Sequence, residues 1–135
     1  MVEKFKKILH ILEEEKGIVY LLALIRLDSF VDEKWSLEIS LDGLKDASTA
    51  SEFFSYIYDL LVSNLSKSEL GEIGRISLHT PDEHIVELFN ATVDVPSGGV
   101  VTLKDQRING YKILEAYVFS SKKATANSTT TLNFM

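Results

Sequence analysis

Two histidines and an aspartate lie close together at His79, Asp82 and His84, and Arg75 precedes them by four residues. Imidazole and carboxylate groups are ligand types that suit zinc, nickel or non-haem iron. Their spacing matches no recognised metal signature, and a carboxylate at Asp82 also suits the start of a helix. No catalytic residue or metal ligand is therefore assigned. These residues are the candidates for a small metal-assisted hydrolase, with Arg75 as a charge stabiliser.

Two further ionic sites are conceivable from the sequence. The start of a helix after His79, together with Arg75, offers donors for a phosphate or carboxylate, but Pro81 removes one N–H group and the following acidic residues repel an anion. The acidic loop before residue 35 could chelate a hard cation. Its spacing lacks the pattern of a calcium-binding loop, so we interpret it as a solvated loop.

Three aromatic residues are candidates for binding a partner protein: Trp35, Tyr56 and Tyr58. Trp35 starts an expected strand, and the two tyrosines straddle the buried stripe of an expected helix. We therefore expect all three to be partly exposed. Partly exposed aromatic side chains are favoured anchors of protein interfaces.

Composition excludes several classes of function. The chain of 135 residues has no cysteine, which excludes disulfides, thiolate metal sites and cysteine nucleophiles. Neither of its two glycine clusters matches a nucleotide-binding loop, so no cofactor is expected. The net charge is −6 and the three arginines lie far apart, so the chain lacks the basic stripe that nucleic-acid binding needs.

No segment is expected to enter a membrane. The longest apolar run, residues 18–25, ends at Arg26 and is far shorter than the roughly 20 residues of a spanning helix. The basic N-terminus resembles a secretory signal only superficially, because His10 and three glutamates interrupt it. A cytoplasmic location is the expectation.

The first part of the chain predicts a helix and two strands. Val2–Lys16 has apolar residues at helical spacing, and Gly17 stands where a left-handed C-terminal cap is expected. Residues 18–27 are apolar without alternation, which is typical of a central strand covered on both faces. Trp35–Leu41 alternates apolar and polar residues, which predicts a strand with one solvent-facing side, paired antiparallel with its predecessor.

The middle of the chain predicts a long helix and a third strand. The helix spans about residues 49–65, with Thr49 and Glu52 as its capping box. A second such box at Ser66 and Glu69 predicts a short helical turn. Residues 75–79 then form a strand, and the crossover through the helix makes it parallel to the previous strand.

The last part predicts a short helix and further strands. Thr80 with Glu83 reads as a capping box for a helix over residues 81–90. Residues 92–95 and 100–103 read as a hairpin around a Pro-Ser-Gly-Gly turn. A turn at residues 109–110 leads to a last strand over residues 112–120.

These elements predict one α+β domain over residues 1–120. It should contain a mixed, mainly antiparallel sheet of about five to six strands and three helices, in the order α-β-β-α-β-α-β-β-β. Helices should cover one face of the sheet, and the first helix or a second copy of the chain should cover part of the other. Residues 121–135 read as a polar C-terminal tail.

The function expected from these features is a small, non-enzymatic protein-interaction or regulatory module. Its partner is expected to be a second copy, forming a homodimer, or another protein, for which the negative charge would suit a basic surface. The alternative is the metal-assisted hydrolase built on His79, Asp82 and His84. A common pocket lined by these residues and Arg75 would favour the hydrolase.

Overall fold

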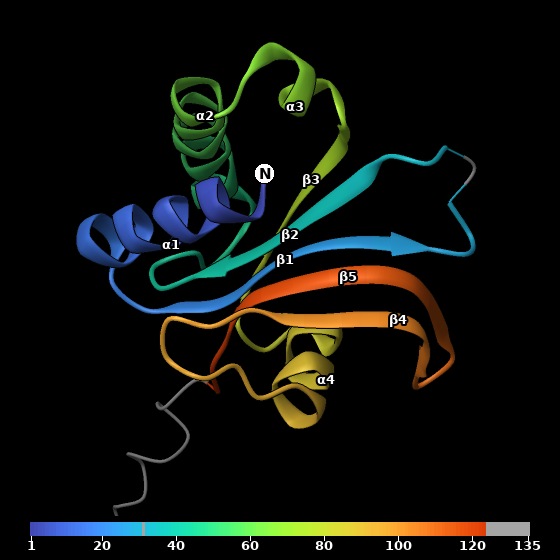
Figure 1. The fold of residues 1–135 in the computed structure, drawn as a ribbon. Helices are drawn as coiled ribbons and strands as arrows, with labels where there is room; N and C mark the ends of the chain where they lie inside the picture. The colour runs from blue at the N-terminus through green and yellow to red at the C-terminus, as the bar shows by residue number, and fades with distance from the viewer. Residues whose placement is uncertain (31, 124–135) are drawn as a thin grey trace, which may run out of the picture.

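Four helices and five strands form the part of the chain that the computed structural model describes, residues 1–30 and 32–123 (Figure 1). Their bounds are α1 Val2–Lys16, β1 Val19–Leu27, β2 Trp35–Leu41, α2 Ala47–Asn64, α3 Lys67–Gly71, β3 Ile73–His79, α4 His84–Thr92, β4 Val101–Ile108 and β5 Tyr111–Ser121. The predicted α+β class is confirmed, and the strand and helix counts come close to the prediction.

The strands form one mixed sheet in the order β3-β2-β1-β5-β4. The strand β1 pairs antiparallel with β2 on one side and with β5 on the other, which confirms its predicted central position. The chain then crosses over through α2 and α3, so that β3 pairs parallel to β2, as predicted. The strands β3 and β4 are the two edges of the sheet.

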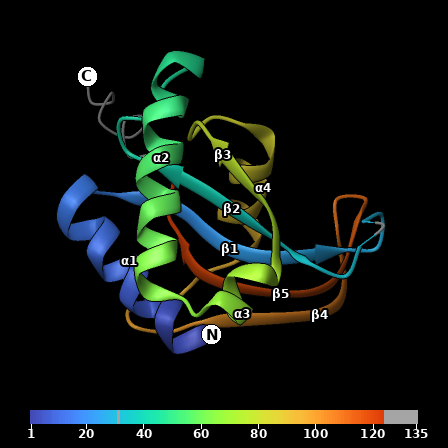
Figure 2. The same cartoon turned by 90° about the horizontal axis from the view of Figure 1, so that it is seen from above.

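The helices α1 and α2 cover one face of the sheet (Figure 2). Apolar residues at helical spacing on both helices pack against the side chains that β1, β2 and β5 direct to that face. The fully buried residues of this core include Phe5, Ile8, Leu12, Leu24, Leu37, Ile39, Ile57 and Leu61. Full burial of each such side chain contributes roughly 1.5–3 kcal/mol to folding.

The helix α4 covers part of the opposite face, over β1, β5 and β4 (Figures 1 and 2). Val86 and Phe89 of α4 pack there against Ala23 and Ile25 of β1 and against Ala116 of β5. Both faces of β1 are therefore buried, as predicted. The cover on the second face comes from α4, whereas α1 lies with α2 on the first face.

Backbone angles decide two predictions about glycine positions, the cap at Gly17 and the turn at residues 109–110. Gly17 has a φ of 91° but a ψ of −136°, because the chain passes directly into extended backbone. The predicted left-handed cap is therefore wrong, although the positive φ still favours glycine. Asn109 and Gly110 have φ values of 46° and 91°, which confirms the tight turn between β4 and β5.

The predicted hairpin over residues 92–95 and 100–103 is wrong. Thr92 is the last residue of α4, and its hydroxyl donates to the carbonyl oxygen of Leu88 over 2.7 Å, one helical turn earlier. Val93 then packs into the core beneath α4. The second half of the expected hairpin belongs to β4, which pairs with β5 instead.

Two helix starts differ from the capping boxes predicted from the sequence. The helix α2 begins after Asp46, whose carboxylate accepts from the backbone N–H groups of Ser48 and Thr49, so Thr49 is the last residue of the box and not the first. The box at Ser66 and Glu69 is confirmed at the start of α3. The helix α4 also begins later than predicted, at His84.

The chain leaves the sheet at Ser121, one residue beyond the predicted last strand. The predicted C-terminal tail falls almost entirely on residues 124–135, which lie outside the described residues. Within the described ranges, no helix has the length and apolar character needed to cross a lipid bilayer.

Candidate functional site

Polar side chains gather on the half of the sheet that α4 leaves uncovered. The parallel register pairs Ser36 with Arg75, Glu38 with Ser77 and Ser40 with His79. Paired residues direct their side chains to the same face of a sheet. The face beside α4 is therefore apolar over β1, β5 and β4 and polar over β2 and β3.

The predicted solvent-facing side of β2 is buried, which corrects that prediction. Ser36 and Ser40 are fully buried, and Glu38 is 6% exposed. The alternation of side-chain types is as predicted, but the strand lies between two neighbours and beside the residues that flank α4. A carboxylate at such a position costs free energy unless charged or hydrogen-bonding partners compensate it.

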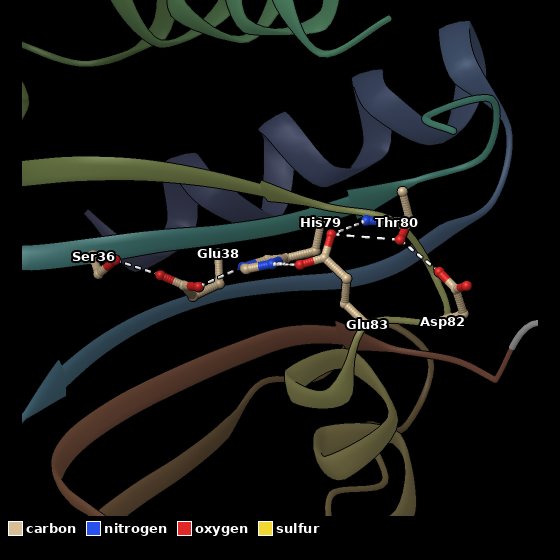
Figure 3. A network of polar contacts seen from close by, with 6 residues as sticks. All are labelled: Ser36, Glu38, His79, Thr80, Asp82 and Glu83. Carbon is tan, nitrogen blue, oxygen red and sulfur yellow. Dashed lines mark hydrogen bonds and ion pairs between the residues drawn. The ribbon is translucent and has the colours of Figure 1, made fainter. Parts of the chain in front are cut away.

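Glu38 has partners at both carboxylate oxygens (Figure 3). The hydroxyl of Ser36 donates to Oε2, and Nε2 of His79 lies 2.7 Å from Oε1. The other ring nitrogen of His79, Nδ1, lies 2.9 Å from Oε1 of Glu83. One imidazole thus joins a buried carboxylate of β2 to a carboxylate at the start of α4.

Glu83 is held in place by the turn that precedes α4. Its Oε2 accepts from the backbone N–H of Thr80 over 2.7 Å. The predicted box at Thr80 is therefore only half formed, because the hydroxyl of Thr80 donates to Asp82 over 2.5 Å instead of capping the helix. The helix begins at His84, with Glu83 as its N-cap, and this corrects the predicted start at residue 81.

The two carboxylates set the charge of His79. Burial of the imidazole opposes its positive charge, but hydrogen bonds and attraction from Glu38 and Glu83 outweigh burial, so the pKa of His79 is raised above its ordinary value. Burial likewise opposes ionisation of Glu83, but the bonds from His79 and the Thr80 N–H hold its pKa below the ordinary value. The cluster thus favours a positive imidazole with an ionised Glu83.

A cavity of about 230 Å³ lies beside this cluster, between the polar strands and α4. Ser36, Glu38, Arg75 and Ser77 line it on the side of β2 and β3. The rest of the wall is apolar or aromatic and comprises Ile25, Leu27, Phe30, Ile85, Leu88, Phe89, Ile108, Tyr111 and Ile113. A mainly apolar cavity with a few polar groups on one side is typical of a small-molecule site.

Arg75 is fixed at the wall of this cavity. Its Nη2 lies 3.2 Å from Oδ2 of Asp32, and its guanidinium carbon lies 4.0 Å from the ring centroid of Phe30. Its Nη1 is buried and has no hydrogen-bond acceptor among the described residues. A buried donor without an acceptor is costly and calls for a physical explanation.

The four candidates for the hydrolase do not line one common cavity. Arg75 lines the cavity beside α4, and His79 adjoins it through Glu38. Nε2 of His84 lies 3.3 Å from Nδ2 of Asn109, at the turn between β4 and β5, and Asp82 contacts Thr80. Within residues 1–30 and 32–123, no group of three or more histidine, aspartate or glutamate side chains is arranged to hold a metal ion.

The three candidate interface aromatics have different surroundings. Trp35 is 4% exposed and packs against Tyr117 and Arg26, so its predicted partial exposure is wrong. Tyr56 is partly buried, with its hydroxyl donating to Glu15 and Lys16 stacked on its ring. Tyr58 is 46% exposed, as predicted.

Tyr58 belongs to an exposed apolar stripe on α2 that the sequence reading missed. Phe54, Tyr58 and Val62 follow one another at intervals of four residues and are 44%, 46% and 49% exposed. The rings of Phe54 and Tyr58 stack with centroids 6.5 Å apart. Their spacing of four residues would have revealed the stripe, since side chains at that interval share one face of a helix. Each of the three residues directly follows a residue of the predicted buried stripe, so their face adjoins the buried one.

Glu38 and Glu83 were also missed as partners of His79. The sequence analysis placed Glu38 on the solvent-facing side of a strand and Glu83 in a helix cap. The lone acidic residue in an otherwise apolar and serine-containing strand was the available signal, because charged residues are rare in strands that are buried on both sides.

Comparison of the chain with protein-family models, with curated proteins and with solved structures gave no match.

Proposed function

We propose that this chain is a non-enzymatic protein-interaction module that pairs with a second copy of itself through α2 and β3. The observation that carries the proposal is the apolar stripe of Phe54, Tyr58 and Val62 beside an open edge of the sheet. An exposed apolar stripe of this kind is favoured at protein interfaces and disfavoured on free surfaces.

The surface around the stripe carries little charge. Among the 18 residues of α2, Glu52 and Asp59 are the charged ones. The whole chain has a net charge of −6, so two copies repel each other on most of their surfaces. A nearly uncharged face is the one on which this repulsion is least, which supports self-association there.

The strand β3 supplies a second reason for a partner at this place. It is an edge strand, paired with β2 alone, and so leaves backbone donors and acceptors unpaired on its outer side. A groove runs between α2 and β3, lined by residues that include Phe54, Tyr58, Leu70, Ile73 and Ile76. Apolar side chains and free backbone groups therefore lie side by side.

A two-fold axis perpendicular to the sheet would satisfy both features at once. Such an axis places β3 of one copy antiparallel to β3 of the other, so that the two sheets become continuous. It also places both α2 helices on the same face of the joined sheet, where their stripes meet. A basic partner protein, suited to Glu52 and Asp59, is the competing occupant.

Sedimentation equilibrium at micromolar concentration tests the pairing. The expected species has twice the 15.2 kDa mass of one chain. Tyr58→Lys should weaken self-association by about tenfold or more, because truncating or charging a central aromatic anchor typically costs over 1.4 kcal/mol. The matched control is Leu114→Lys, which removes an exposed apolar side chain from β5, a strand separated from β3 by β2 and β1.

Hydrogen exchange supplies an independent readout of the β3 edge. The outward-facing amides of β3 should exchange slowly in the paired protein and rapidly in Tyr58→Lys. A wild-type chain that stays monomeric at high micromolar concentration contradicts the proposal. So does a dimer that Tyr58→Lys and Leu114→Lys leave equally strong.

Other parts of the sequence interpretation stay proposals. The acidic net charge supports a function without nucleic acid, and the absence of cysteine is consistent with a cytoplasmic location. We also retain the expectation that the chain requires no cofactor. The metal-assisted hydrolase built on His79, Asp82 and His84 remains the alternative.

A further inference from the structure

We infer that the cavity beside α4 binds a small apolar molecule, of about the size of a substituted benzene, through packing alone and without a hydrogen bond. The cavity lies on the face of the sheet opposite to α1 and α2. The proposed pairing uses the outer side of α2 and β3. The inference therefore concerns a second site and does not rest on that pairing.

The volume of the cavity suits one substituted ring. At about 230 Å³, it exceeds the roughly 150 Å³ of an engineered apolar cavity that stays dry and binds benzene. Ile85 and Leu88 line it from α4, and Ile25 and Ile113 line it from β1 and β5. A molecule in the cavity therefore contacts the helix and the sheet at once. It fills space in which these side chains otherwise lack packing partners.

Three aromatic side chains at the cavity favour a ring over an aliphatic chain. Phe30 lies in the loop after β1, Phe89 on α4 and Tyr111 at the start of β5. Aromatic rings in offset or edge-to-face contact gain free energy beyond that of their buried area. Tyr111 is 39% exposed and Phe89 is 3% exposed, so a molecule can enter beside Tyr111 and become enclosed beside Phe89.

The polar residues on β2 and β3 present little polar surface to the cavity. Ser36, Glu38, Arg75 and Ser77 border it, yet its surface consists mainly of apolar atoms. Figure 3 shows the reason for Glu38, since the hydroxyl of Ser36 contacts one carboxylate oxygen and the imidazole of His79 contacts the other. These polar atoms bond to one another along the sheet.

The guanidinium of Arg75 is likewise engaged by neighbouring side chains. Its Nη2 lies 3.2 Å from Oδ2 of Asp32, and its central carbon lies 4.0 Å from the ring centroid of Phe30. Its Nη1 is shielded from solvent, so a molecule in the cavity cannot reach it. A polar group of a ligand would therefore lose its water and gain no strong partner, which is costly. This cost selects an apolar molecule.

Two probes of nearly equal size test the ligand class on the wild-type chain. Ethylbenzene is wholly apolar, and benzyl alcohol carries a hydroxyl in place of its methyl group. Binding is followed by the chemical shifts of backbone amides and methyl groups, which should change most at Ile85, Leu88 and Ile113. Ethylbenzene should bind about tenfold more tightly than benzyl alcohol, or more, because the hydroxyl gains no strong partner in the cavity.

Two substitutions at Ser77 distinguish a polar contact from simple filling of space. Ser77→Ala removes the hydroxyl from the wall of the cavity and should leave the affinity for ethylbenzene nearly unchanged. Ser77→Phe places a ring at the same position and should weaken ethylbenzene binding by about tenfold or more. Chemical denaturation of both variants shows whether they fold.

A substitution on α4 narrows the cavity from the opposite side and keeps the test independent of β3. Ile85→Trp should weaken ethylbenzene binding as Ser77→Phe does. The matched control is Ile11→Trp, which enlarges a partly buried residue of α1 on the other face of the sheet. This control should leave the affinity for ethylbenzene unchanged.

Arg75 also borders the groove beside α2, so the probes are tested on Tyr58→Lys as well. Unchanged ethylbenzene binding in this variant supports the inference, whether or not the wild-type chain forms a dimer. Benzyl alcohol that binds as tightly as ethylbenzene overturns it, as does the absence of ethylbenzene binding to the wild-type chain. Shifts confined to α2, or binding that Ser77→Phe and Ile85→Trp both leave unchanged, would also overturn it.

Discussion

Nε2 of His79 lies 2.7 Å from Oε1 of Glu38, although the two residues are 41 positions apart and belong to different strands. The parallel pairing of β2 and β3 brings them to the same face of the sheet. With Glu83 on the other ring nitrogen, the imidazole is the central group of a mostly buried chain of charges. Removing either carboxylate should therefore change the proton affinity of His79 and the stability of the domain.

Glu38→Gln should lower the pKa of His79. Glutamine preserves a polar side chain at this position but removes the negative charge that favours the protonated imidazole. The pKa of His79 is measured by following its ring protons in NMR spectra across a pH series. We also expect the free energy of unfolding to fall by roughly 1–3 kcal/mol near pH 6.

The control for this substitution is Glu87→Gln, which removes the same charge from an exposed position on α4. It should leave the pKa of His79 and the stability nearly unchanged. A pKa of His79 that is the same in wild type and Glu38→Gln would show that Glu38 does not contribute to its raised value.

The stability that His79 contributes should be greatest between about pH 4.5 and 6.5. The pKa of His79 is raised above its ordinary value of 6.5 on folding, so its contribution is complete below that value and is lost as the pH rises through the raised folded-state pKa. The pKa of Glu83 is lowered below its ordinary value of 4.5, so its contribution is complete above that value and is lost as the pH falls through the lowered pKa.

Chemical denaturation of wild type and His79→Gln across this pH range measures the effect. The difference in the free energy of unfolding should be largest near pH 5.5 and decrease toward alkaline pH. A difference that does not vary with pH would mean that His79 contributes as a neutral hydrogen-bonding group only.

The two histidines proposed as metal ligands should respond differently to substitution. His84→Ala should change the free energy of unfolding by no more than about 0.5 kcal/mol, because His84 is exposed and its side chain is hydrogen-bonded to the exposed turn residue Asn109. His79→Ala should cost roughly 1–3 kcal/mol, because it leaves the buried Glu38 with fewer partners.

Zinc titration decides whether these histidines act together. A shared site would stabilise the wild-type chain against unfolding as zinc is added, and both alanine variants would lose that stabilisation. We expect added zinc to leave the wild-type stability unchanged. A zinc-dependent increase that both substitutions abolish would restore the metal-assisted hydrolase as the better hypothesis.

The sequence was sufficient to predict two of the four strand pairings, β1 with β2 and β2 with β3, and the central position of β1. The apolar run of β1 requires neighbours on both sides, and the long helix between β2 and β3 requires a crossover, which makes those two strands parallel. The predicted hairpin after α4 failed because an isolated run of β-branched residues fits a strand and a buried helix end equally well. Residues 101–103, expected to be the second strand of this hairpin, belong to β4 and pair with β5 instead.

The candidate site was less predictable because it depends on the register between strands and on which faces of the sheet are shielded from solvent. Alternation in β2 shows which side chains share a face, but it does not show whether solvent reaches that face. Ser36, Glu38 and Ser40 look like solvent-facing residues and are buried instead. Likewise, His79 could be placed at the end of a strand, whereas its contact with Glu38 follows from a pairing between distant segments.

Trp35 and Tyr58, both expected from the sequence to be partly exposed interface residues, should have different roles, with Trp35 required for folding and Tyr58 for association. Trp35 is 4% exposed and packs against Tyr117, with ring centroids 5.4 Å apart, and beneath the guanidinium of Arg26. Trp35→Ala should therefore lower the free energy of unfolding by roughly 3–5 kcal/mol, through lost packing and a cavity.

Tyr58→Ala should leave the free energy of unfolding of the dilute, monomeric chain within about 0.5 kcal/mol of wild type, because nearly half of the side chain is already exposed. Its effect should appear in the dissociation constant of the paired protein, measured by sedimentation. Unfolding of both variants is followed by far-ultraviolet circular dichroism, because one of them lacks the single tryptophan. If Tyr58→Ala destabilised the monomer as much as Trp35→Ala, the stripe on α2 would be part of the folded core, and its availability for pairing would be refuted.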